Sequence, residues 1–318
     1  MRPTIVLALF VVWFPLAAQM QPNDGIEVSL QRDDATLRGT LRHPEHASQI
    51  LIVHAGSGPT DRDGNQPAMK NNSLRLLAEG LAADGIAVLT FDKRGAGQTG
   101  LSLNESELRP STYINDLAAW VNWSRKKHPD LAIHLLGHSE GALFAKAVAR
   151  QMSNSESPLT SVISLAGAGR PAGTLLREQT AGRLPGTLAK EFETVLSNLE
   201  QGETVSEVNP MLNSLFRPSV QPYLIEWLTM DPAVIAEALE VPLLVISGSA
   251  DLQVVEADFR ALSTHGDQAE WIDGMNHVLK AAKGPIQAQM ASYTNTELPL
   301  HPDLLPLLSD WFDSFEDR

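Results

Sequence analysis

A serine between two glycines is the feature of this sequence with the clearest chemical meaning. Gly137-His-Ser139-Glu-Gly141 lies between residues 131–136, a short apolar run that predicts a strand, and residues 141–152, an alanine-rich stretch that predicts a helix. A tight strand-to-helix turn strains the serine backbone and exposes its hydroxyl, and side chains two positions away would clash there. Glycine avoids that clash, so the pattern predicts that Ser139 is a nucleophile.

A serine hydroxyl is a weak nucleophile and needs a base. Downstream of Ser139 there are three histidines: His265, His277 and His301. We expect His277 to be the base, because its polar loop follows the predicted short strand 269–272 and can reach over the carboxyl edge of a sheet. The other two stand at the end of a predicted helix and before a proline. His138, beside the serine, is expected to point away and to be structural.

The base needs an acid that orients it and stabilises its cation. Asp251 follows the predicted strand 243–247 through Gly248-Ser-Ala, again at the carboxyl edge, where catalytic groups of open α/β sheets gather. Asp258 lies within a predicted helix, and Asp273 is too close in sequence to His277 to brace it. We therefore expect Asp251 to be the acid.

Acyl transfer also requires two backbone N–H groups for the developing oxyanion. One is expected from Glu140, directly after the serine. The other is expected from the glycine-rich loop 54–59, which follows the predicted strand 50–53. Ser57 is the favoured donor and Gly56 the alternative, and an ordinary glycine turn is the structural alternative for this loop.

Two further charged segments have structural explanations. Asp61-Arg-Asp-Gly-Asn65 resembles the start of a calcium loop, but Gln66 and Asn72 stand where an EF-hand needs glycine and glutamate. We expect a hydrogen-bonded turn there and no metal. Asp92-Lys-Arg94 is expected to form a buried or rim ion pair rather than a catalytic element.

Alternating strands and helices predict an α/β fold with a mostly parallel sheet and an antiparallel N-terminal hairpin, residues 25–30 and 35–41. Residues 170–240 break the rhythm, because they show helical patterning at 188–199, 220–230 and 233–239 and no convincing strand. We interpret them as a helical cap inserted into a core made of residues 20–169 and 241–318.

The N-terminus predicts export. Arg2 is followed by the uncharged apolar stretch 5–16 and then by small residues at 17 and 18, which is typical of a signal peptide over residues 1–19. The stretch is shorter than a bilayer span. We expect a periplasmic or secreted protein with no stable membrane association after cleavage; the alternative is an uncleaved anchor.

Composition excludes several classes of protein. The 318 residues carry a net charge of −14, which argues against a nucleic-acid partner, since affinity for phosphate backbones depends on cationic side chains. There is no cysteine, so disulfides, thiolate metal sites and a cysteine nucleophile are ruled out. The chain is long enough to bury a large core.

The motifs together resemble the α/β-hydrolase superfamily, and most closely bacterial esterase-like hydrolases of the serine-aminopeptidase-like or lysophospholipase-like kind. The likeness covers almost the whole mature chain and rests on these segments: 55–65, 92–97, 137–141, 248–251, 274–277 and 215–224. It implies a triad of Ser139, His277 and Asp251 that hydrolyses carboxylic esters without a cofactor. Ala55-Gly56 stands where many relatives carry His-Gly, which leaves the oxyanion donor open.

The expected activity is hydrolysis of a small-molecule carboxylic ester through an acyl-enzyme. The same triad acting on a peptide, thioester or lysophospholipid bond is the alternative, with Glu226 and Glu237 as candidates for binding a free amino terminus. A non-catalytic binding module is a third possibility, although such modules usually have a broken triad. Five apolar cap residues are expected either to line an acyl pocket or to pack internally: Leu215, Phe216, Trp227, Leu228 and Met230.

Overall fold

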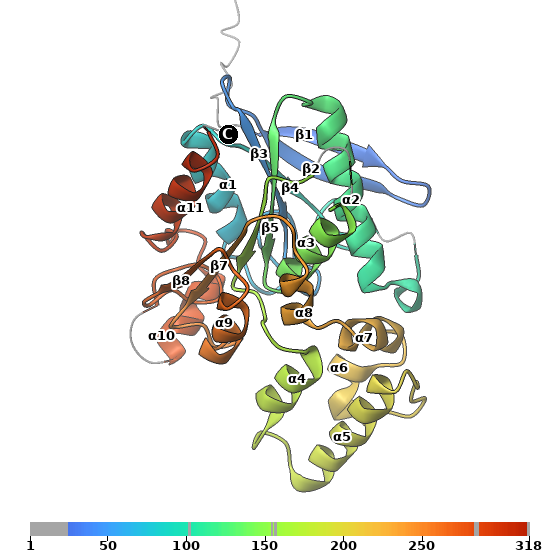
Figure 1. Ribbon diagram of the computed structural model, residues 1–318. Helices are drawn as coiled ribbons and strands as arrows, with labels where there is room; N and C mark the ends of the chain where they lie inside the picture. The colour runs from blue at the N-terminus through green and yellow to red at the C-terminus, as the bar shows by residue number, and fades with distance from the viewer. Residues whose placement is uncertain (1–24, 101–102, 154, 156–157, 283–285, 317–318) are drawn as a thin grey trace, which may run out of the picture.

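The computed structural model describes residues 25–100, 103–153, 155, 158–282 and 286–316 (Figure 1). The predicted signal peptide, residues 1–19, lies outside the described residues. The central element of the described structure is an eight-stranded sheet with the order β1-β2-β4-β3-β5-β6-β7-β8. The strands are β1 (Ile26–Gln31), β2 (Thr36–Arg42), β3 (Gln49–His54), β4 (Ala87–Phe91), β5 (Ala132–His138), β6 (Ser161–Leu165), β7 (Leu243–Gly248) and β8 (Gln268–Ile272).

The predicted mostly parallel sheet with an antiparallel hairpin is confirmed. Strands β1 and β2 pair antiparallel, β2 joins β4 antiparallel, and every pairing from β4 to β8 is parallel. The carboxyl ends of β3, β5, β7 and β8 therefore meet at one edge of the sheet. All four of the segments that carry the predicted site residues begin at this edge.

Helices cover both faces of the sheet. Helices α1 (Ser73–Ala83) and α11 (Leu304–Asp313) share one apolar cluster, and α2 (Pro110–Lys127), α3 (Glu140–Gln151) and α9 (Glu256–Ser263) share the other. Strand β3 serves both clusters, because Ile50 and Ile52 join one while Leu51 and Val53 join the other. This period of two is the pattern of a central strand that is buried on both sides.

The segment between β6 and β7 is helical throughout its regular structure. It contains α4 (Ala172–Thr180), α5 (Gly186–Glu200), α6 (Asn213–Phe216), α7 (Gln221–Leu228) and α8 (Pro232–Glu237). Helices α4 to α7 extend below the sheet in Figure 1 and share their own apolar cluster, whereas Ile235 of α8 packs into the core. The sequence predicts α5, α7 and α8 but not α4 or α6.

Short α10 (Ile286–Ala291), near the C-terminus, is not predicted either. No helix in the described part of the chain is both long and apolar enough to span a membrane.

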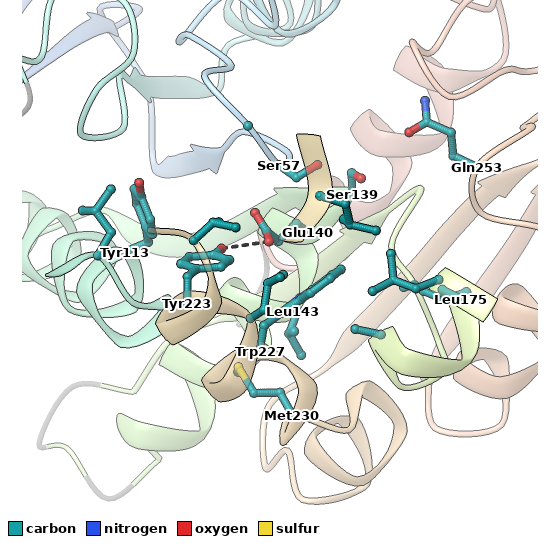
Figure 2. A pocket seen from close by; sticks show the side chains of 18 of the residues that line it. Ser57, Tyr113, Ser139, Glu140, Leu143, Leu175, Tyr223, Trp227, Met230 and Gln253 are labelled. Atoms are coloured by element: carbon teal, nitrogen blue, oxygen red, sulfur yellow. Dashed lines mark hydrogen bonds between the residues drawn. The ribbon is translucent and has the colours of Figure 1, made fainter. Parts of the chain in front are cut away.

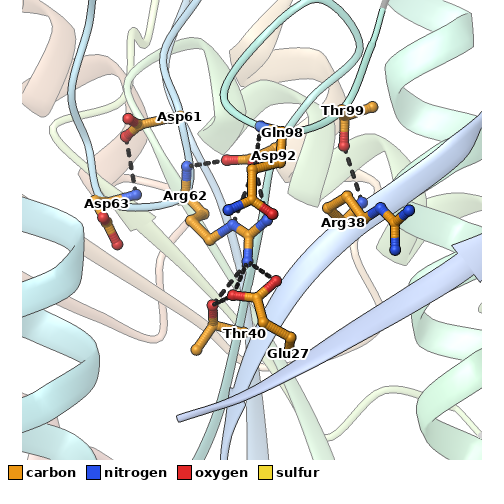
Figure 3. Close-up of polar contacts among 9 residues, drawn as sticks. All are labelled: Glu27, Arg38, Thr40, Asp61, Arg62, Asp63, Asp92, Gln98 and Thr99. Carbon is orange, nitrogen blue, oxygen red and sulfur yellow. Dashed lines mark hydrogen bonds and ion pairs between the residues drawn. The ribbon is translucent and has the colours of Figure 1, made fainter. Parts of the chain in front are cut away.

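Arg62 fastens the loop after β3 to the loop after β4 (Figure 3). Its guanidinium donates to the Asp92 carboxylate at 2.8 and 3.0 Å and to both oxygens of Glu27 at 2.8 Å. The same Asp92 carboxylate accepts the backbone N–H of Gln98 at 2.8 Å. The predicted ion pair is thus confirmed for Asp92, and Arg94 likewise pairs with buried Asp116 at 2.6 Å.

Candidate active site

The backbone of Ser139 is strained at the turn between β5 and α3. Its φ of 57° and ψ of −123° place a non-glycine residue in a conformation that L-residues rarely adopt. The flanking glycines are required by space: a Cβ on Gly137 would lie 2.0 Å from the Gly141 carbonyl oxygen, and one on Gly141 would lie 2.4 Å from that of His54. Such strain at a short turn is typical of a functional site.

Ser139, His277 and Asp251 form one hydrogen-bonded chain. The Oγ of Ser139 lies 3.1 Å from Nε2 of His277, and Nδ1 of His277 lies 2.7 Å from Oδ2 of Asp251. Three segments that are distant in the sequence, following β5, β7 and β8, supply the three side chains. Because Nδ1–H donates to the carboxylate, Nε2 is the nitrogen that can accept the serine proton.

The carboxylate of Asp251 is held in its ionised form. Burial raises the pKa of Asp251, but the charge and hydrogen bond of His277 and the N–H groups of Val254 and Gln253 outweigh burial and lower it. Those two N–H groups donate to Oδ1 at 2.9 and 2.7 Å. The other oxygen is thereby left for His277, and the carboxylate can stabilise an imidazolium.

His138 supports the loop that carries His277. Its Nε2 lies 2.8 Å from the carbonyl oxygen of His277. Burial, followed by the nearby His277 ring, lowers the pKa of His138 to about 4. The ring is therefore neutral near pH 7, and its Nε2–H donates to that carbonyl. The structural role expected for His138 is therefore to hold the main chain of His277.

Two residues that line the cavity with Ser139 have backbone N–H groups for which the described part of the chain provides no acceptor. Within the described part of the chain, the N–H groups of Ser57 and Glu140 donate no hydrogen bond. Ser57 lines the same cavity as Ser139 and Glu140, as Figure 2 shows. Gly56, the alternative donor, passes so close to the serine that a Cβ on it would lie 3.0 Å from the Ser139 Cβ, but it does not line the cavity.

A cavity of about 650 Å³ opens over Ser139. Its walls come from the core and from the helices between β6 and β7 (Figure 2). The apolar part of the lining includes Leu143, Leu175, Leu176, Trp227 and Met230. Ligand pockets in proteins have volumes of about 300–1,000 Å³, so this cavity can hold a small organic substrate.

Sequence and structure comparisons place the chain in a family. Residues 70–281, more than half of the chain, match the model of the serine aminopeptidase S33 family. The chain belongs to the serine aminopeptidase S33 family. This S33 member is also 29% identical over 244 residues to esterase EstD of Thermotoga maritima, an alignment that covers 74% of this chain and 55% of EstD. The chain thus spans about half of the length of this curated relative.

Solved structures show the same α/β-hydrolase fold for this S33 member. Est1E of Butyrivibrio proteoclasticus, in a complex with ferulic acid, has a TM-score of 0.59 at 17% identity, covering 91% of this chain and 97% of its own. The Pyrococcus furiosus esterase Pf2001 has a TM-score of 0.57 at 17% identity, covering 95% and 96%. At this identity the likeness establishes the fold.

Of the apolar cap residues predicted from the sequence, only some line the cavity of this S33 member. Leu215, Trp227 and Met230 do, whereas Phe216 is fully buried among the helices of residues 172–237 and Leu228 packs against the same cluster. Helical spacing alone does not distinguish the inner face of a short helix from the face over the cavity.

The two acidic candidates for binding an amino terminus do not line the cavity either. Glu226 accepts hydrogen bonds from the N–H and hydroxyl of Ser111 at the start of α2, and Glu237 is exposed at the end of α8. Two other carboxylates line the cavity: Glu140, beside Ser139, accepts a hydrogen bond from the Tyr223 hydroxyl at 2.8 Å, and Glu105 accepts one from the Arg217 guanidinium at 2.9 Å. Burial raises the pKa of Glu140, and Lys93 opposes the rise.

Residues 61–65 form the expected hydrogen-bonded turn. Oδ1 of Asp61 accepts the N–H groups of Asp63 and Asn65 at 3.0 and 2.8 Å. Asp61 therefore serves its own loop, and among the residues described no group of acidic, histidine or cysteine side chains has the arrangement of a metal site.

Sequence reasoning missed Lys93 and Tyr223 as parts of the site. Lys93 directly follows β4, at the same sheet edge as the serine, and it is buried. The available signal was its position between Asp92 and Arg94, directly after the short apolar run 87–91. Nothing in the sequence indicates that Tyr223 reaches Glu140, because α7 and α3 are distant in the chain.

Proposed function

We propose that this S33 member is a serine hydrolase that cleaves carboxylic esters through an acyl-enzyme, with Ser139, His277 and Asp251 as its catalytic triad. The observation that carries the proposal is the continuous hydrogen-bonded chain from Asp251 to the Ser139 hydroxyl, which opens onto a cavity. The name of EstD, a relative at 29% identity, supports the same reaction class.

The geometry supports a complete proton cycle. Ser139 Oγ attacks the ester carbonyl carbon while His277 Nε2 takes the hydroxyl proton, and Asp251 stabilises the imidazolium. The carbonyl oxygen becomes an oxyanion that accepts the N–H groups of Ser57 and Glu140. Collapse breaks the bond to the alcohol oxygen, which receives the proton from His277.

Water completes the cycle. It attacks the acyl-serine as His277 removes its proton, and the second tetrahedral intermediate releases the carboxylic acid and returns the proton to Ser139. Each proton and electron pair is carried by the triad, the substrate or water, so this scheme uses no cofactor.

We propose that residues 170–240 act as a cap whose apolar residues bind the acyl part of the substrate. Leu175, Trp227 and Met230 lie below Ser139 in Figure 2, and the polar lining residues Tyr113, Tyr223 and Glu140 lie to its left. Apolar walls with a few polar groups suit acids with a short to medium acyl chain or an aromatic ring. Est1E, which has the same fold, was solved with ferulic acid, an aromatic acid.

The competing substrates are peptides, thioesters and lysophospholipids. The triad does not discriminate among leaving groups. However, neither Glu226 nor Glu237 lines the cavity, and the two carboxylates that do, Glu140 and Glu105, already accept hydrogen bonds from Tyr223 and Arg217, which favours esters.

A hydrolysis panel tests the proposal. It contains p-nitrophenyl esters of increasing chain length, an aromatic ester, one thioester and one aminoacyl amide, assayed with wild type and with Ser139→Ala. We expect ester turnover by wild type, its loss in Ser139→Ala, and unchanged thermal unfolding. Preferred cleavage of the amide or thioester would contradict the substrate class, and unchanged turnover by Ser139→Ala would contradict the mechanism.

A further inference from the structure

Lys93 makes an unusual contact for a buried cation. Its Nζ donates a hydrogen bond to the backbone carbonyl oxygen of Gly56, in the loop after β3. The side chain is 5% exposed, and within the described residues it forms no ion pair. Its neighbours in sequence behave differently, because Asp92 and Arg94 are both in ion pairs.

A buried ammonium without a bonded carboxylate is costly. Burial lowers the pKa of Lys93 to about 8, and the charge of Glu140 opposes the fall. The ammonium is therefore mostly protonated near pH 7. The groups around it are Glu140 on α3, the ring of Tyr113 on α2 with its centroid 5.7 Å from Nζ, and His54 and His138, whose pKa values are lowered to about 3 and about 4.

The carbonyl that Lys93 binds belongs to the same peptide unit as the N–H of Ser57. A peptide unit is planar, and in the trans form its C=O and N–H point in opposite directions. No cis peptide occurs in the described chain. Fixing the Gly56 oxygen toward Lys93 therefore aims the Ser57 N–H away from Lys93. Among the residues that the structure describes, that N–H has no acceptor, and Ser57 lines the cavity at Ser139.

We propose that Lys93 is a positioning residue for the oxyanion hole: by holding the Gly56 carbonyl, it orients the Gly56–Ser57 peptide so that the Ser57 N–H can donate to the oxyanion of the tetrahedral intermediate. The inference rests on the proposed esterase function. The positive charge also polarises the peptide, which makes its N–H a stronger donor.

The loop is thus held at both ends from the segment after β4. Asp92 binds the guanidinium and backbone N–H of Arg62 at the far end, and Lys93 binds Gly56 at the end next to the serine. The Asp92–Arg62 contact fixes the path of the loop. Of the two contacts, only that of Lys93 with Gly56 involves the peptide that carries the oxyanion donor.

The test compares Lys93→Met, which keeps most of the side-chain volume but removes the donor and the charge, with Lys93→Arg, which keeps both. Lys127→Met is the matched control, because Lys127 is exposed at the end of α2. Each variant is assayed for kcat and KM on the best p-nitrophenyl ester, for inhibition by a trifluoromethyl ketone, which binds serine hydrolases as an oxyanion, and for thermal unfolding.

We expect Lys93→Met to lower kcat by about 10- to 100-fold, less than the 10²–10³-fold typical of deleting an oxyanion donor, with KM within about twofold. Affinity for the trifluoromethyl ketone should fall by a similar factor. Lys93→Arg should recover most of both losses, and Lys127→Met should match wild type. An unchanged kcat in folded Lys93→Met, or a rise in KM with unchanged ketone affinity, would overturn the inference.

If Lys93→Met does not fold, the alkaline pH dependence decides. Wild-type kcat should decline above about pH 8, because the neutral amine is a weaker donor to the Gly56 carbonyl and no longer polarises its peptide, and kcat of Lys93→Arg should not decline. The same decline of kcat at alkaline pH in wild type and in Lys93→Arg would overturn the inference. A wild-type protein that neither hydrolyses esters nor reacts with a fluorophosphonate would instead overturn the proposed function itself, and this inference with it.

Discussion

The side chain of His138 holds the main chain of His277: Nε2 of the first lies 2.8 Å from the carbonyl oxygen of the second. The residue before the candidate nucleophile therefore fixes the loop that carries the candidate base. Their rings lie 5.0 Å apart, so the two histidines form one local unit.

Removing this contact should misplace the base. We expect His138→Ala to lower kcat by about tenfold or more, because small displacements of catalytic groups are costly, and to reduce the free energy of unfolding by about 1–3 kcal/mol. His138→Gln, whose amide can donate to the same carbonyl, is the control and should recover part of both. Steady-state kinetics and denaturant unfolding measure the effects; full activity in His138→Ala would refute the positioning role.

Glycine is required beside Ser139 because a side chain there would clash, and measurements of the free energy of unfolding can test this explanation. Gly137→Ala places a methyl group 2.0 Å from the backbone of Gly141, so we expect a loss of more than about 2 kcal/mol in the free energy of unfolding. The matched control is Gly186→Ala at the start of α5, where a Cβ meets nothing within 4 Å. It should be neutral or slightly stabilising. Equal effects of the two substitutions would contradict the steric explanation.

Lys146 should make stability depend on pH. It is fully buried on α3, its nearest hydrogen-bond partner is the Ser164 hydroxyl at 3.4 Å, and burial lowers its pKa from 10.5 to about 7. Between these values the unfolded chain binds more protons, so stability should rise with pH from about 7 toward 10.5. Below about pH 7, the buried side chain is protonated in the folded protein as well, so the full free-energy cost of burying the ammonium then lowers stability.

Lys146→Met removes that penalty. We expect it to raise the free energy of unfolding at pH 7 by roughly 2–4 kcal/mol and to flatten the rise between pH 7 and 10. Exposed Lys127→Met again serves as the control. Denaturant unfolding across this pH range gives the result, and a lower stability of Lys146→Met at pH 7 would show that the ammonium is better accommodated than its burial implies.

We also predict export with cleavage near Ala18 or Gln19. Expression of the full chain in a bacterial host, followed by fractionation and intact-mass analysis, should find the mature protein outside the cytoplasm and shortened by residues 1–18 or 1–19. A protein retained in the membrane fraction at full mass would support the uncleaved anchor instead.

The sequence was sufficient for the elements with strong local patterns. Strand β7 was predicted over residues 243–247 and spans Leu243–Gly248, and the glycine pair around Ser139 identified the turn because the steric requirement is local. His277 and Asp251 could be placed near each other because parallel strands bring their carboxyl ends to one edge.

Features that depend on tertiary contacts could not be predicted in this way. Helix α4 has only Leu175 and Leu176 as large buried side chains, too few for a clear helical period. The contact of Lys93 with Gly56 joins two loops that follow neighbouring strands, and local sequence carries no information about which carbonyl a lysine will meet.

The most direct test of the central claim is detection of the acyl-enzyme. Wild type mixed with a p-nitrophenyl ester, quenched within one turnover, digested and analysed by mass spectrometry should carry the acyl group on the peptide that contains Ser139. His277→Ala should acylate far more slowly, and Ser139→Ala should not acylate. An acyl group on another residue, or turnover that persists in Ser139→Ala, would contradict the account.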